Sequence, residues 1–105
     1  RWTALIRTPD FVTDEDLQSA VAELKRKGKG PAVERVRLQR LEEGECVQVL
    51  HVGPYSAEPP TIEALHAFAA QQGRTLSGRH HEIYLSDPRR VPPERLKTIL
   101  RQPVT

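Results

Sequence analysis

The 105-residue sequence contains no methionine and a single cysteine, Cys46. One cysteine cannot form an internal disulfide, which fits a reducing, cytoplasmic location. No apolar run approaches the ~20 residues that cross a bilayer, and no basic-then-apolar leader is visible, so we expect no membrane association. The sequence opens at Arg1 in the middle of a strand-like pattern, and we therefore expect a fragment truncated at its N-terminus.

Aromatic residues are also scarce: the chain has one tryptophan, two tyrosines and two phenylalanines. Its 16 basic and 14 acidic residues leave a net charge of only +2. Because a nucleic-acid interface usually concentrates basic charge and places stacking aromatics within it, we expect no nucleic-acid binding through this segment. The four histidines and Cys46 lack the spacing of metal ligands, and no glycine-rich phosphate loop occurs. We predict neither a metal nor a cofactor.

The first third of the chain predicts one strand and one helix. Residues 2–7 are mostly β-tolerant and stop before Pro9, which is typical of a strand. Thr13 is a good N-cap, and a single apolar stripe with helical spacing follows it before Gly28 ends the pattern. We expect a helix over residues 13–28.

The remainder predicts a sheet with a second helix. Residues 33–41 alternate between charged and apolar, and residues 46–52 return as a second strand after a polar, glycine-containing turn, which indicates a hairpin. A helix should run from Pro59 to Gly73, followed by a strand over 80–86, a helical turn at 92–94 and a closing strand over 97–101. This β-α-β-β-α-β-β order predicts an α+β fold with helices on one face of an antiparallel sheet.

The strand over 80–86 carries the most informative polar residues. Its alternation suggests that Ile83 and Leu85 face the helices, which places Glu82, Tyr84 and Ser86 on the opposite, uncovered face. A carboxylate beside a phenol can hold a cation or a polarised ring, or can position a water for attack. The alternative is an ordinary solvated sheet face.

Tyr55 follows Gly53 and Pro54 at the end of a predicted strand, and Glu58 comes three residues later. Glycine and proline fix the chain path there, so the tyrosine ring can be held at the mouth of a cleft. The alternative is that Tyr55 closes the end of the core.

Three blocks of sequence resemble the GyrI-like small-molecule-binding family, in its standalone subgroup: residues 43–55, residues 80–89 and residues 93–104. The resemblance implies the regulatory factor effector-binding fold, in which two β-α-β-β modules related by a pseudo-twofold enclose a ligand cleft. In that scheme residues 1–105 are a single-domain fragment. Residues 1–8 would be the last strand of the first module, 13–28 a linker helix and 33–105 the second module.

The resemblance also implies a function. Relatives include effector domains of AraC- and MerR-type multidrug regulators, in which an acid at the place of Glu82 lies among aromatics and receives flat, often cationic ligands. We therefore expect the binding of amphipathic aromatic or cationic small molecules. The alternative is a detoxifying hydrolase, because some standalone relatives open cyclopropane-bearing, DNA-alkylating natural products with water.

The candidate residues follow from these two expectations. The catalytic candidates are Glu82, Glu58 and Tyr55; the ligand-binding candidates are Glu82, Tyr84, Tyr55, Trp2 and His51. Because half of the implied cleft is missing, we also expect a homodimer that covers the exposed face.

Overall fold

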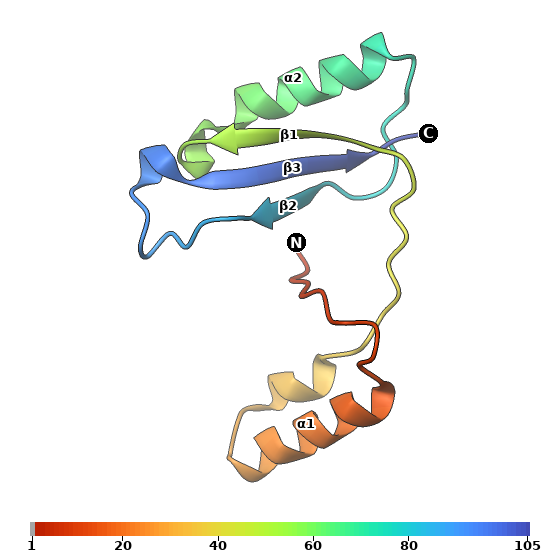
Figure 1. Ribbon diagram of the computed structural model, residues 1–105, viewed down its shortest axis with the longest axis vertical. Helices are drawn as coiled ribbons and strands as arrows, with labels where there is room; N and C mark the ends of the chain where they lie inside the picture. The colour runs from red at the N-terminus through yellow and green to blue at the C-terminus, as the bar shows by residue number, and fades with distance from the viewer. Residues whose placement is uncertain (1) are drawn as a thin grey trace. The chain divides into compact units, whose positions relative to one another are not determined.

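The computed structural model describes residues 2–105 and divides into two compact units, the first ending at Leu41 and the second spanning Glu42–Thr105 (Figure 1). The first unit holds the helix α1 (Asp14–Arg26) and the 3-10 helix η1 (Pro31–Arg35). The second holds the following elements in order: β1 (Cys46–Val52), η2 (Tyr55–Ala57), α2 (Glu58–Gln71), β2 (His81–Tyr84), η3 (Pro93–Arg95) and β3 (Lys97–Pro103).

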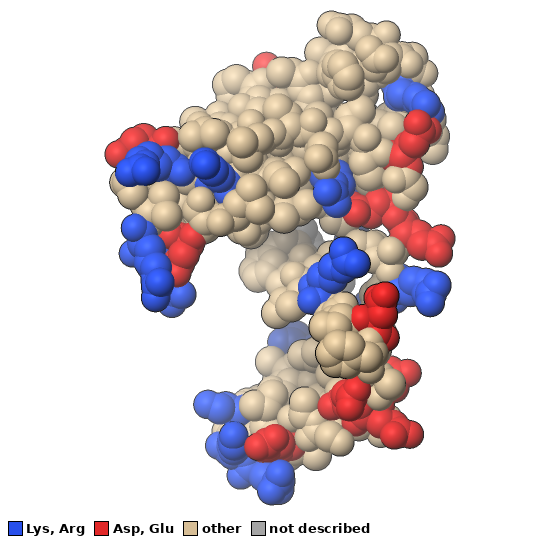
Figure 2. Space-filling model, viewed as in Figure 1, with Lys and Arg blue, Asp and Glu red and all other residues tan. Residues whose placement is uncertain are grey.

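The helix α1 begins at a reciprocal cap, as the sequence predicts. The Asp16 backbone N–H donates to Thr13 Oγ1 at 3.2 Å, and the Thr13 backbone N–H donates to Asp16 Oδ2 at 2.9 Å. Acidic residues fill the first turn and basic residues the last, as the helix dipole favours. Figure 2 accordingly shows acidic as well as basic side chains on the visible face of this unit.

Two predicted strands are wrong. Residues 2–8 form no strand, and the predicted hairpin strand over 33–41 is replaced by η1 and an extended segment. A strand needs a backbone ladder, and β1 takes its ladder from β3 instead of from the preceding residues. Pro31 at the start of η1 also favours a tight turn over a strand.

The second unit is a three-stranded antiparallel sheet in the order β1-β3-β2, so the last strand of the chain is its centre. Val49 pairs with Leu100 and Glu82 also pairs with Leu100, which fixes the register of all three strands. The predicted strands 46–52, 80–86 and 97–101, the helix after Pro59 and the turn at 92–94 are confirmed as β1, β2, β3, α2 and η3, with small differences at their ends.

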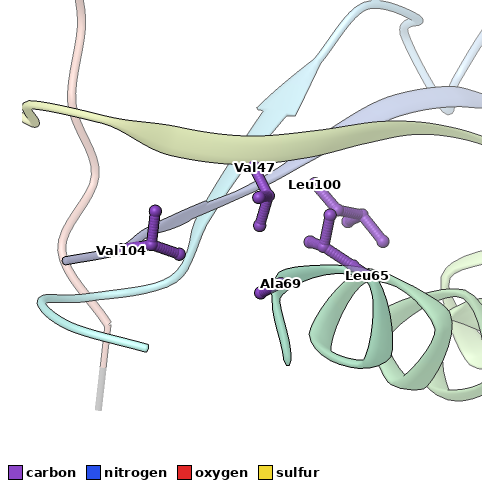
Figure 3. Packing of buried hydrophobic residues seen from close by; sticks show 5 residues of the cluster. All are labelled: Val47, Leu65, Ala69, Leu100 and Val104. Carbon is purple, nitrogen blue, oxygen red and sulfur yellow. The ribbon is translucent and has the colours of Figure 1, made fainter. Parts of the chain in front are cut away.

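The core lies between α2 and one face of β1 and β3 (Figure 3). It is formed by small and branched apolar side chains: Val47, Leu65, Ala69, Leu100 and Val104. Leu100 and Ala69 are completely buried. Apolar side chains of this size each stabilise the fold by about 1.5–3 kcal/mol when buried.

The register corrects the predicted face of Glu82. Glu82 lies opposite Leu100 and Tyr84 lies opposite Thr98, and both β3 residues are buried on the face that α2 covers. Directly opposed residues of an antiparallel pair point to the same side of the sheet. Glu82 and Tyr84 therefore lie on the helix side, and Ile83 lies on the other. The prediction failed because it assumed that helices cover the whole width of one face, whereas α2 packs against β1, two strands away from β2.

Candidate functional site

Four side chains gather on the helix side of the sheet, and we call them the carboxylate–tyrosine cluster: Tyr55, Glu58, Glu82 and Tyr84. The first two follow β1 and the last two belong to β2. A sharp turn after β1 brings them together. Gly53 has φ 135°, a conformation that favours glycine, and its N–H donates to the Leu96 carbonyl at 2.8 Å.

His51 anchors this turn from within the sheet. Its side chain is buried, and Nε2 lies 3.1 Å from the Pro54 carbonyl oxygen while Nδ1 lies 2.9 Å from Thr61 Oγ1. A carbonyl oxygen only accepts, so Nε2 carries the proton and donates to Pro54. In the neutral ring Nδ1 then accepts from the Thr61 hydroxyl. His51 therefore ties the end of β1 to the start of α2.

Glu58 is the buried acid of the cluster, with only 5% of its surface exposed, and its Oε2 has no hydrogen-bond partner. Burial raises the pKa of Glu58 to about 7; a hydrogen bond with the Glu82 side chain and the charge of that carboxylate add to the rise, and the nearby His51 opposes it. Near pH 7 the Glu58 carboxyl is therefore protonated in about half of the molecules. Such a pair offers both a proton donor and a carboxylate.

The two tyrosines form an aromatic edge beside the acids. Their rings meet edge to face, with centroids 5.6 Å apart and an interplanar angle of 76°. Partial burial raises the pKa of Tyr84 above its usual value although the residue is 62% exposed, and the charges of Glu82, Glu58 and Tyr55 raise it further. The Tyr84 phenol consequently remains protonated at neutral pH and can donate a hydrogen bond.

The structure adds groups that the sequence analysis did not single out. His80 Nε2 lies 3.5 Å from Glu82 Oε2. Thr98, only 1% exposed, lies opposite both His51 and Tyr84, and its Oγ1 has no hydrogen-bond partner. The two-residue spacing of His80 and Glu82 could have revealed their shared face. Nothing local in the sequence marks Thr98, because its position beside His51 and Tyr84 is set by the register of the strands.

The model of the GyrI-like small molecule binding domain matches residues 6–105. The chain belongs to the GyrI-like family. Its fold, a mixed α/β module with an antiparallel sheet, agrees with that membership, and the domain is one that binds small molecules.

Three solved structures from Listeria innocua are similar to this GyrI-like domain. Two are described as hydrolases, with 47% and 48% identity and TM-scores of 0.85 and 0.83; the third is an uncharacterised conserved protein, with 50% identity and a TM-score of 0.87. Each match covers 94% of this chain, and 52% or 50% of the other. The chain thus spans about half the length of these proteins. No protein with a curated description matches it.

Trp2 and His51 differ from the other candidates of the GyrI-like domain. Trp2 belongs to the first unit and is 84% exposed, so its part in ligand binding stays a prediction. His51 borders the cluster, but both of its ring nitrogens already have partners within the protein. Among residues 2–105 no group of three or more potential ligands is arranged to hold a metal, and no helix is long and apolar enough to cross a membrane.

Proposed function

We propose that this GyrI-like domain binds amphipathic aromatic or cationic small molecules at the carboxylate–tyrosine cluster. The observation that carries the proposal is Glu58: a carboxyl group that is 5% exposed, with one oxygen lacking any partner. Buried polar atoms in proteins are normally hydrogen-bonded, so an unpartnered one beside an aromatic edge indicates that a ligand or water completes the site. A cytoplasmic location stays a prediction that rests on the single cysteine.

Charge and ring geometry favour a flat cation. Glu82 supplies the carboxylate, and the faces of Tyr55 and Tyr84 attract positive charge at about 0.5–2 kcal/mol for each well-placed contact. The cationic side chains of the central strand, Lys97 and Arg101, alternate onto the other face of the sheet. They therefore do not compete for the carboxylates.

A fluorescence titration with the permanently cationic dye ethidium tests the proposal. We expect Glu82→Gln to weaken binding about tenfold, since one charge contact in a partly buried site is worth about 1.4 kcal/mol. Glu63→Gln, an exposed acid on α2, is the matched control and should bind as the wild type does. The neutral probe N-phenyl-1-naphthylamine should respond little to Glu82→Gln. Equal ethidium affinity in wild type and Glu82→Gln contradicts the proposal.

A second candidate function is the hydrolysis of cyclopropanoid compounds in the same place. Two similar proteins are described as hydrolases, and the acid whose pKa is raised to about 7 suits proton transfer at neutral pH. In this mechanism the Glu82 carboxylate takes a proton from a water molecule while the oxygen of that water bonds to a cyclopropane carbon. The ring C–C bond breaks, its electron pair moves into the conjugated cyclohexadienone, and the carbonyl oxygen takes a proton to become a phenol. Tyr55, Tyr84 or protonated Glu58 would polarise that carbonyl.

Mass spectrometry after incubation with a cyclopropane-bearing dienone tests the hydrolase. The expected product has gained one water. Glu82→Gln should abolish its formation while a neutral aromatic analogue still binds, and Glu63→Gln should retain the wild-type rate. Equal hydrolysis rates in wild type and Glu82→Gln would end the catalytic proposal and leave binding alone.

A further inference from the structure

His80 stands at the entry to β2 and faces the acids of the cluster. Its Nε2 lies 3.5 Å from Glu82 Oε2, longer than a good hydrogen bond. That nitrogen is buried and has no hydrogen-bond partner, although 28% of the side chain is exposed. The imidazole thus contacts solvent through part of the ring while its Nε2 points toward the carboxylate.

Three ionisable side chains therefore form a row in space: His80, then Glu82, then the buried Glu58 of α2. Glu82 is the shared neighbour, because its Oε2 lies beside the imidazole and its carboxylate is close enough to Glu58 to raise the pKa of that acid. When the His80 ring is charged, it forms an ion pair with the Glu82 carboxylate and reduces the repulsion between Glu82 and Glu58. When His80 is neutral, Glu82 is available to another cation.

We propose that His80 is a positioning residue that acts through Glu82, governing how the two carboxyl groups hold their proton and releasing a cationic ligand from the site when its ring becomes charged. The inference rests on the proposed binding function of the cluster. It assigns a regulatory role to a residue that need not contact the ligand.

Among the described residues other ionisable groups also belong to the elements around this row, and α2 itself carries His66, whose buried Nε2 has no hydrogen-bond partner. Tyr84 comes from the same strand, Tyr55 from η2 and His51 from the end of β1. The central strand presents Thr98 and Leu100 on this face, neither of which titrates. His81, the next residue in the chain, points to the opposite face and lies 3.5 Å from Glu43. It is therefore a matched control on the same strand with a different carboxylate.

The test is an NMR titration of the Glu58 side-chain carboxyl carbon in the protein without ligand. We expect His80→Gln to raise the Glu58 midpoint by about half a unit, or about threefold in proton affinity, because a cation that favours ionised acids is removed. His81→Gln should leave the midpoint unchanged. In a Glu82→Gln background, adding His80→Gln should cause no further shift, because the effect passes through Glu82.

One further variant, together with the His81→Gln control, keeps the outcome decisive. His80→Lys retains a cation and should keep the Glu58 midpoint at or below that of the wild type, and it provides the comparison if His80→Gln does not fold. Superimposable Glu58 titrations in wild type, His80→Gln and His80→Lys overturn the inference. An equal shift in His81→Gln also overturns it, because the effect would then not be specific to the row.

Ligand release is measured separately with ethidium, so that failure of binding and failure of the inference are distinguishable. Between pH 8 and pH 6 we expect the wild-type affinity to fall about tenfold and that of His80→Gln about threefold. Equal falls in the two proteins contradict the role of His80 even if ethidium binds. Absence of ethidium binding at every pH contradicts the proposed function, while the carboxyl titration still reports on His80.

Discussion

The rings of Tyr55 and Tyr84 meet edge to face at a centroid distance of 5.6 Å, although one residue precedes α2 in the sequence and the other follows it. This contact joins the turn after β1 to the edge strand β2. It also gives the acids Glu58 and Glu82 an aromatic border, which is the feature that distinguishes the cluster from a solvated row of carboxylates.

The aromatic pair should contribute to ligand binding through its rings. We expect Tyr55→Ala or Tyr84→Ala to weaken ethidium binding about 2- to 30-fold, in line with about 0.5–2 kcal/mol for a cation–π contact. Tyr84→Phe retains the ring and should stay within about twofold of the wild type. A loss in Tyr84→Phe as large as that in Tyr84→Ala would show that the hydroxyl, rather than the ring, is needed.

Glu58 should make the second unit less stable as the pH rises. Because its pKa is raised to about 7 in the folded state from 4.5, the folded chain holds this proton more tightly than the unfolded chain does. That contribution to stability is complete below pH 4.5 and is lost as the pH rises through 7. Glu58→Gln, which cannot ionise, should therefore be more stable than the wild type at pH 8 by about 1–3 kcal/mol and nearly equal to it at pH 4.5.

Urea unfolding at the two pH values measures this difference. Glu63→Gln serves as the control, because that acid is exposed on the same helix. A stability difference between Glu58→Gln and wild type that is the same at both pH values would contradict the raised pKa.

The His51 network should hold the turn that carries Tyr55. Replacing His51 with alanine leaves the Pro54 carbonyl and the Thr61 hydroxyl without their partner and creates a void, so we expect about 2–4 kcal/mol of destabilisation. Thr61→Val removes one hydrogen bond and should cost about 1 kcal/mol. Thermal or urea unfolding checks both values; a loss in Thr61→Val as large as that in His51→Ala would argue against the two-bond network.

The uncovered face of the sheet should support a homodimer. Leu50, Ile99 and Ile83 lie in one row across the three strands, and Leu50 is half exposed. Sedimentation velocity should show association of the wild type at high concentration, weakened in Leu50→Glu. A strictly monomeric wild type would refute this prediction.

The elements with complete local signals could be predicted from the sequence. Thr13 marks the start of α1, Pro59 lies in the first turn of α2, and the strand-like run 46–52, ended by Gly53 and Pro54, marks β1. The strands over 2–7 and 33–41 were wrong because β-tolerant residues in the first segment and alternation in the second show only that the backbone tolerates extended structure. Whether it becomes a strand depends on a partner elsewhere in the chain.

The candidate site was predicted in its composition but not in its geometry. Glu82, Tyr84, Tyr55 and Glu58 were all named, yet the face assigned to Glu82 was wrong because that face is set by register with Leu100 on β3. The sequence also gave no sign that Glu58 is buried beside Glu82, since that contact depends on the position of α2 over the sheet. Both features are set by contacts between residues that are far apart in the sequence.

The most direct test of the account is a backbone and side-chain NMR map of ethidium binding to the wild type and to Glu82→Gln. The account predicts that the largest shifts fall on Tyr55, Glu58, Glu82 and Tyr84, and that they largely disappear in Glu82→Gln. Shifts that centre on α1 or on the opposite face of the sheet, or that persist in Glu82→Gln, would contradict it.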